Sequence, residues 1–322
     1  MKSNLSNLKP LIVILGPTAS GKTALSIALA KNFNGEIVSA DSRQIYRGMD
    51  IGTAKPPRNE KLKMKNEKFD CVIIETIPHY MIDICDPDEE FTLQHYKQTA
   101  IGIIKDIQSR GKLPFLVGGT GLYISAVVDN LEIPEVSPNQ ALRQKLETKS
   151  NKELFQDLKR VDPLSAETID RNNKRRLVRA LEVCIVTGRP FSSQRNKGKP
   201  LFDALQIGIS FPKEELYKKI DERVDEQFET GLEDEVKGLK EKYGCRVPAM
   251  SGIGYHEMCE YSEGKFTFEE AVRKIKSNTK KYAKRQMVWF KRDPRIHWIT
   301  KQSEAEKLIK AFLKENKNHL DK

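Results

Sequence analysis

The sequence predicts an α/β protein, in which helices cover a parallel β-sheet core and a helical domain is inserted into the chain. Short apolar runs alternate with helical patterns over residues 1–133, as is typical of parallel sheets. Helices with charged faces follow, and a strand pattern returns at 204–211. We therefore expect a first core segment at 1–133, an insertion at 134–202, and the rest of the core at 203–322. This last part is largely helical and ends in a basic segment.

The individual elements follow from local patterns. Leu11–Leu15 is a short aliphatic run, and it leads into the glycine-rich loop GPTASGKT and then into a helix from about Lys22. The run from Leu93 to Arg110 has helical apolar spacing and ends at Gly111. Further strands are expected at Glu36–Ala40, Phe69–Glu75, Met81–Cys85 (the weakest), Leu113–Val117, 204–211 and Ile296–Ile299.

Charge and hydropathy limit the class of protein. The net charge is +11 and the isoelectric point about 9.2, which favours a polyanionic partner such as nucleic acid. Hydrophobic residues make up 38% of the chain, enough for a core. No apolar run approaches the roughly 20 residues of a bilayer span, and MKSNLSNLKP lacks the apolar segment of a signal peptide. We expect a cytoplasmic protein that does not bind membranes.

The five cysteines are scattered and form no C-x-x-C pair. This spacing argues against a zinc site and against a disulfide framework, so reduced thiols are expected throughout.

The motif G-x-x-x-x-G-K-T at 16–23 is the main chemical signal. Between a strand and a helix it forms a P-loop, whose backbone N–H groups and helix dipole bind phosphates, usually those of ATP or GTP. Lys22 would contact phosphate oxygens, and the Thr23 hydroxyl would bind Mg²⁺. The sequence thus predicts a P-loop NTPase-like core. The N-K-x-D signature of a guanine site is absent.

Two acidic residues follow expected strands. Asp41 would face the same crevice as the P-loop, where it could orient Mg²⁺ or act as a general base. It could equally be a turn or helix-capping aspartate, which is common in Asp-Ser sequences. The residues alone leave these alternatives open. For Glu75 a structural role is favoured.

Two segments carry the positive charge. Residues 171–200 hold nine Lys and Arg and one acid, and residues 267–300 hold ten and three. In the first segment an apolar face is expected at Leu177, Leu181, Cys184 and Ile185, with the arginines largely off it. Such lopsided charge favours contact with a nucleic-acid backbone over a face that is merely solvated.

The chain resembles a known family, the bacterial tRNA dimethylallyltransferases, over nearly its whole length. The resemblance rests on seven segments in order: GPTASGKT (16–23), DSRQIYRGMDIGTAKP (41–56), PHYMIDICDP (78–87), VGGTGLYI (117–124), RRLVRALEV (175–183), MSGIGYHE (250–257) and KRQMVWFKRDPRIHW (284–298). It implies transfer of a dimethylallyl group from dimethylallyl diphosphate to N6 of the adenosine at tRNA position 37. The P-loop would hold that diphosphate with Mg²⁺, and ATP would not be consumed.

The resemblance also implies roles for individual residues. Asp41 would be the general base at the adenine amine, Thr120 would hydrogen-bond near the reacting base, and Lys22 would stabilise the leaving diphosphate. The donor site would comprise Gly16, Pro17, Thr18, Ala19, Ser20, Gly21, Lys22, Thr23 and Arg223, with Thr23 on the metal. The tRNA anticodon stem-loop would be contacted by Asp41, Ser42, Arg43, Gln44, Thr120, Arg143, Arg175, Arg176, Leu177, Val178 and Arg179.

Two other functions fit the residues without the resemblance. A small-molecule kinase would use the same P-loop but leaves the basic insertion unexplained. A non-catalytic RNA-binding protein could use the P-loop as a nucleotide switch. We also expect a monomer. The stretch at 57–77 is longer than the family pattern suggests, which leaves the loop geometry there open.

Overall fold

The computed structural model describes residues 8–57, 68–134, 136–194 and 196–320, so residues 58–67 of the long stretch at 57–77 lie outside the described residues. The chain divides into two compact units. Unit 1 comprises Met1–Val128 and Leu201–Lys322, and unit 2 comprises Asp129–Pro200. The sequence analysis expected the insertion at 134–202, a few residues further along at each boundary.

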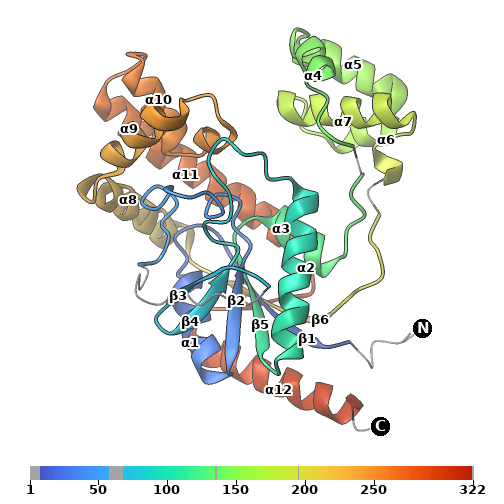
Figure 1. Ribbon diagram of the computed structural model, residues 1–322, viewed down its shortest axis with the longest axis vertical. Coiled ribbons are helices and arrows are strands. Elements are labelled where there is room, and N and C mark those ends of the chain that lie inside the picture. Colours follow the sequence, from blue (N-terminus) through green and yellow to red (C-terminus); the bar gives the residue numbers. More distant parts are fainter. Residues whose placement is uncertain (1–7, 58–67, 135, 195, 321–322) are drawn as a thin grey trace. The chain divides into compact units, whose positions relative to one another are not determined.

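Unit 1 is built on a seven-stranded sheet in the order β3-β4-β2-β5-β1-β6-β7 (Figure 1). Its strands are β1 Pro10–Leu15, β2 Gly35–Ser39, β3 Cys71–Ile74, β4 Ile77–Tyr80, β5 Leu113–Gly118, β6 Asp203–Ile209 and β7 Ile296–Ile299. All neighbouring strands are parallel except the β3–β4 hairpin. In the centre, Ile12 of β1 lies opposite Phe115 of β5 and Leu205 of β6. The predicted fold class is therefore confirmed.

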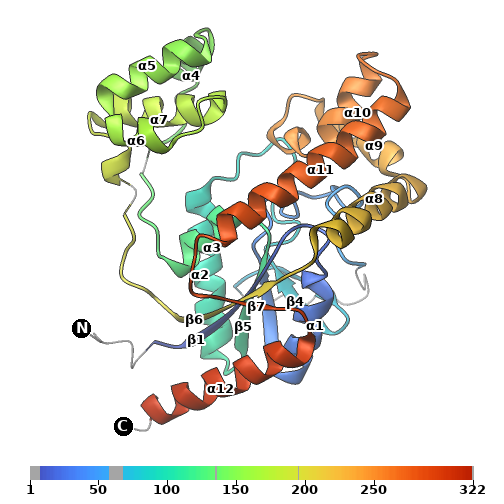
Figure 2. The ribbon, with the colours of Figure 1, turned by 180° about the vertical axis from the view of Figure 1, so that it is seen from behind.

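Alternation along β1 shows how the sheet is buried on both faces. Leu11, Val13 and Leu15 pack with helices α2 (Leu93–Ser109) and α3 (Gly121–Val128). Ile12 and Ile14 point the other way, toward α1 (Lys22–Asn32) and α12 (Gln302–Leu320). Figures 1 and 2 show these helix layers from opposite sides. A strand covered on both faces reads as a continuous apolar run, which is why LIVIL was recognisable.

The expected strand at Met81–Cys85 is wrong. The strand lies earlier, at Ile77–Tyr80, and pairs with β2 and β3. It follows β3 through a two-residue turn in which Glu75 and Thr76 have φ values of 47° and 79°. Hairpin turns of this kind usually contain Asn or Gly, so Glu-Thr gave no turn signal in the sequence. After β4, Met81 and Asp83 also adopt positive φ and end the strand.

Four helices form a second core in unit 1: α8 (Lys213–Glu229), α9 (Leu232–Tyr243), α10 (Tyr255–Ser262) and α11 (Phe268–Phe290). Their buried side chains pack with Ile45 and Met49 from the loop after β2. Cys245 and Cys259 form a disulfide across this group, so reduced thiols were the wrong expectation for this pair. Their 14-residue separation does not show that the fold brings their Cα atoms to 5.9 Å. Cys71, Cys85 and Cys184 are buried.

Unit 2 is a bundle of α4 (Gln140–Glu147), α5 (Asn151–Val161), α6 (Pro163–Thr168) and α7 (Lys174–Thr187). Its core contains Leu154 and Leu158 of α5 with the expected face of α7. Leu177, Leu181 and Cys184 are buried in that core, but the side chain of Ile185 is exposed. The predicted face of α7 is thus correct except at its last position.

The longest described helix, α11, has 23 residues and carries many charged side chains. Among the described residues, no helix combines the length and apolar character needed to cross a membrane.

Candidate functional site

The P-loop joins the end of β1 to the first residue of α1, so the predicted order of strand, loop and helix is confirmed. Its path requires left-handed backbone conformations at Ala19 (φ 62°) and Gly21 (φ 76°). Within the described part of the chain, no hydrogen bond uses the N–H groups of Gly21, Lys22 or Thr23. Free amides at a helix N-terminus are the feature that binds phosphate groups.

Lys22 lies over this loop, and its Nζ donates a hydrogen bond to the carbonyl oxygen of Pro17 at 2.6 Å. Burial lowers the pKa of Lys22 to about 8; the nearby Asp41 carboxylate opposes this shift and the Arg223 guanidinium adds to it. An anion bound here would favour the protonated ammonium. The site is therefore electrostatically suited to a group with several negative charges.

Asp41 stands at the carboxyl end of β2, across the pocket from the P-loop. Ala40 is fixed to β5 by its N–H, which donates to the Val117 carbonyl oxygen at 2.7 Å. The Asp41 Oδ1 accepts from the Arg43 N–H at 2.9 Å, so one carboxylate oxygen shapes a turn. Asp41 also lines the pocket that contains Lys22. Asp41 therefore both forms a turn and lines the pocket, so these two interpretations do not exclude each other.

Thr120 belongs to the glycine-rich loop after β5 and is tied to the Asp41 segment. Its N–H donates to the Ala40 carbonyl oxygen at 3.1 Å, and its Oγ1 accepts from the Ser42 N–H at 3.1 Å. Gly118 permits this close approach, because a Cβ atom there would lie 2.2 Å from the same Ala40 oxygen. The two loops are thus bonded to each other, and Asp41, Gly118 and Gly119 from them line the pocket.

Helix α11 supplies two pocket residues that sequence reasoning did not assign to the site, Tyr282 and Gln286. Burial raises the pKa of Tyr282 to about 12, and Asp41 adds to this shift. Both residues follow the helical spacing of α11, a pattern that is more often typical of a packed face than of a functional site. The signal that could have identified Gln286 is a polar carboxamide on an otherwise apolar stripe.

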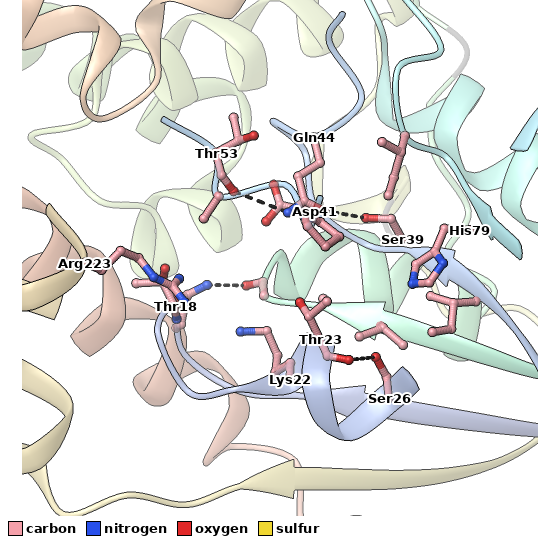
Figure 3. Close-up of a pocket in the computed structure, with 18 of the residues that line it drawn as sticks. Thr18, Lys22, Thr23, Ser26, Ser39, Asp41, Gln44, Thr53, His79 and Arg223 are labelled. Carbon is pink, nitrogen blue, oxygen red and sulfur yellow. Dashed lines mark hydrogen bonds between the residues drawn. The ribbon is translucent and has the colours of Figure 1, made fainter. Parts of the chain in front are cut away.

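Figure 3 shows the pocket with the cationic groups Arg223 and Lys22 on one side and His79 on the other. Burial lowers the pKa of Arg223 and lowers that of His79 to about 4, so the imidazole is neutral at physiological pH. The pocket is lined by Thr18, Lys22, Thr23, Ser26, Ile37, Ser39, Asp41, Gln44, Thr53, Ala54, Pro56, His79, Ile82, Val117, Gly118, Gly119, Arg223, Tyr282 and Gln286. His79, Ser39, Ser26 and Thr53 were not among the predicted residues.

The loop that carries Gln44 and Thr53 is held by two charged side chains. Lys55, whose side chain is 2% exposed, donates to the Tyr46 carbonyl oxygen and to the Asp83 carboxylate, each at 2.6 Å. Glu235 of α9 accepts from the N–H groups of residues 50, 51 and 52 at 2.7 to 3.0 Å. These contacts fix the backbone of DSRQIYRGMDIGTAKP and keep the side chains after Asp41 in place.

Two of the residues predicted to contact tRNA also have partners within unit 1. The Arg43 guanidinium donates to the carbonyl oxygens of Pro248 and Ala249 and to Ser251 Oγ. The Gln44 amide donates to the Thr53 carbonyl oxygen at 3.3 Å. Arg43 therefore joins the DSRQ segment to the MSGIG segment.

The predicted residues of unit 2 fall into two groups. Arg143 and Arg179 both donate to Glu182, which is fully buried in α7, at 2.6 to 3.0 Å. Leu177 and Val178 are also buried, whereas Arg175 and Arg176 are exposed. The structure thus brings Arg143 and Arg179 together around one carboxylate and leaves Arg175 and Arg176 in solvent.

Comparison with known proteins shows which family the sequence matches. The sequence profile of the IPP transferase family matches residues 44–293, and that of the isopentenyl transferase family matches residues 9–70. The chain is 46% identical to a tRNA dimethylallyltransferase of Roseiflexus castenholzii over 93% of this chain and 95% of that protein. A homologue of the same name from Acetivibrio thermocellus is 45% identical with the same coverage.

Solved structures of transferases with related names have a similar fold. The full-length tRNA isopentenylpyrophosphate transferase of Bacillus halodurans superimposes with a TM-score of 0.70 at 36% identity, over 98% of this chain and 100% of that one. A eukaryotic dimethylallyltransferase, whose structures describe its action on tRNA, has a TM-score of 0.71 at 30% identity. That match covers 92% of this chain and 75% of the eukaryotic one.

Proposed function

The chain belongs to the IPP transferase family, and on this premise we propose that it transfers a dimethylallyl group from dimethylallyl diphosphate to tRNA. The acceptor we propose is N6 of the adenosine at position 37, beside the anticodon. One observation supports this most: a single pocket joins a cationic phosphate loop to a carboxylate, with Lys22 and Arg223 near one end and Asp41 on the wall.

The reaction would be a displacement at the allylic carbon of the donor. A C–N bond forms to the adenine amine, the C–O bond to diphosphate breaks, and the amine proton moves to the Asp41 carboxylate. Negative charge develops on the leaving oxygen, where Lys22, Arg223 and the free P-loop amides would stabilise it. Asp41 is a suitable proton acceptor because only one of its oxygens is used in the turn.

The pocket residues also fit a magnesium ion. Mg²⁺ prefers oxygen ligands and is commonly held by one or two protein groups together with substrate phosphates. The Thr23 hydroxyl is an oxygen donor that lines this pocket. When bound, the ion would neutralise charge on the diphosphate. No described group of three or more acidic, histidine or cysteine side chains could hold a metal alone, so the diphosphate would complete its shell.

For tRNA we propose contacts from both units. The Asp41–Gln44 segment and Thr120 would surround the target adenine, which must leave its stack to reach the pocket. Arg175 and Arg176 of α7 would contact phosphates of the anticodon stem-loop, because their side chains are exposed. We propose that the enzyme acts on tRNA in the cytoplasm, as a monomer.

The test is to incubate the protein with unmodified tRNA, Mg²⁺ and labelled dimethylallyl diphosphate, with labelled ATP in a parallel reaction. We expect label from the prenyl donor at an adenosine beside the anticodon and no consumption of ATP. The opposite outcome, ATP hydrolysis or phosphate transfer without prenylation, would indicate a kinase or a nucleotide-switched RNA-binding protein.

A further inference from the structure

Helix α11 lies against the glycine-rich loop after β5 with one stripe of side chains, Tyr282, Gln286 and Trp289. Gln286 Nε2 donates to the Gly119 carbonyl oxygen at 2.8 Å. Tyr282 lies beside Thr120, whose side chain opposes the effect of burial on the Tyr282 pKa. Trp289 fills the space beside Gly121, where a Cβ atom would lie 2.4 Å from its ring. Three positions at i, i+4 and i+7 thus face three consecutive residues, 119 to 121.

Gln286 also reaches the P-loop. Its Oε1 accepts a hydrogen bond from the Thr18 N–H at 2.8 Å. One buried carboxamide, 6% exposed, therefore joins the loop that would hold the donor to the loop that would face the acceptor. The two bonded backbone groups lie on loops about 100 residues apart in the sequence.

The chemistry of this bridge specifies glutamine. A backbone N–H can only donate and a backbone carbonyl can only accept, so the bridging group must offer one acceptor and one donor. A carboxamide meets both needs. A carboxylate could accept from Thr18 but would place its charge against the Gly119 oxygen. A methionine of similar length would leave both backbone groups unpaired.

We propose that Gln286 is a positioning residue, which sets the spacing between the bound diphosphate and the bound adenine. This inference rests on the proposed function. Bond formation requires the allylic carbon and the amine to meet at about 3 to 3.5 Å, and a misplacement of about 1 Å can cost about a hundredfold in rate. The bridge acts on the two loops and does not touch the reacting atoms.

The experiment compares Gln286→Glu and Gln286→Met with the wild type in three assays: pyrophosphate binding, tRNA binding, and the single-turnover transfer rate with both substrates saturating. We expect the transfer rate to fall by about a hundredfold in both variants. In Gln286→Met, binding of pyrophosphate and of tRNA should change by less than about threefold, because each loop keeps its own binding groups. In Gln286→Glu the added charge would weaken pyrophosphate binding, which is why the rate is measured with both substrates saturating.

A pH profile distinguishes positioning from general damage. In Gln286→Glu, a protonated carboxyl group could again donate to Gly119 and accept from Thr18, and its buried position favours protonation. The wild-type rate divided by the Gln286→Glu rate should therefore fall toward one as the pH falls. In Gln286→Met this ratio should not change in that way. The charged and titratable groups that share the pocket are Lys22, Arg223, Asp41, His79 and Tyr282. Both proteins contain all five, so the ratio of their rates reports mainly the change at residue 286.

Ile275→Ala is the matched control. Ile275 is buried in the same helix but belongs to the α8–α11 core and does not line the pocket. It should lower the melting temperature without a selective loss of transfer rate. Wild-type transfer rates in the Gln286 variants would overturn the proposal, and so would rate losses that match losses in substrate binding and melting temperature. Failure of the wild type to transfer label would instead refute the proposed function.

Discussion

Helices α7 and α11 both appear in the sequence as basic helices with one apolar face, yet the structure uses them differently. In α7, Arg179 donates a hydrogen bond to the buried Glu182, and Arg143 of α4 does the same. In α11, Lys276 and Lys280 pair with Asp225 and Asp221 of α8 on the surface. The groups that α11 delivers to the pocket are uncharged at neutral pH: Tyr282 and Gln286.

This difference shows that a count of cations does not identify the cations available to a polyanion. Glu182 is the only acidic residue in the segment 171–200, and it faces the interior with two arginines around it. Arg175 and Arg176, on the same helix, remain exposed. The basic segment of α7 thus serves both to stabilise unit 2 and to present charge.

The largest effect is expected from Glu182→Gln, which would remove the charge that holds Arg143 and Arg179. Loss of one member of a buried ion pair costs roughly 3 to 5 kcal/mol, and the lower value is expected because both arginines reach solvent. Amide hydrogen exchange in α4–α7 should show the loss. Fluorescence of Trp289 and Trp298, both in unit 1, should report unchanged unfolding there.

A matched control is Glu147→Gln on the exposed end of α4, which should leave exchange unchanged. Equal protection in the two variants would mean that Glu182 does not stabilise unit 2.

Burial raises the pKa of Glu182, but hydrogen bonds from Arg143 and Arg179 leave it below the usual 4.5. Because the folded-state pKa is lowered, its contribution is present at neutral pH and is lost as the pH falls below about 4.5.

The exposed arginines should give the next largest effect. The double variant Arg175→Gln/Arg176→Gln should weaken tRNA binding by about tenfold. It should also reduce the slope of log affinity against log salt by up to about two, one for each phosphate that is no longer neutralised. The control is Lys307→Gln/Lys310→Gln on α12, which removes equal charge from exposed positions of unit 1 on the face of the sheet that α1 and α12 cover. Equal salt slopes in the two double variants would show that α7 does not contact the RNA.

A pH-dependent effect is expected at Lys22, and near pH 8 it is smaller than the two effects above. The pKa of Lys22 in the free site is about 8, so above that pH most molecules carry a neutral amine at this position. Those molecules must take up a proton when diphosphate binds. Affinity for inorganic pyrophosphate should therefore fall by about tenfold for each pH unit well above 8. Calorimetry in buffers of different ionisation enthalpy should detect the uptake. Lys22→Arg should abolish it, and persistent uptake in that variant would assign the proton to another group.

The parts of the molecule that were predictable from sequence are those encoded locally. The run LIVIL, the P-loop and the final strand Ile296–Ile299 each carry their own signal, and all three lie where expected. The β4 strand was missed because its turn contains no glycine or asparagine. The Cys245–Cys259 disulfide and the Gln286 bridge join segments that meet only after folding, so the sequence pattern does not show which groups these side chains contact.

The central claim is that the bond forms in the pocket between the P-loop and Asp41. The most direct measurement is the single-turnover transfer of label from dimethylallyl diphosphate to tRNA by Asp41→Ala, with tRNA binding measured on the same preparation. We predict a loss of at least about a hundredfold in rate, the scale of one acid–base group, with tRNA binding retained. A transfer rate close to that of the wild type would contradict the account and remove Asp41 from the mechanism.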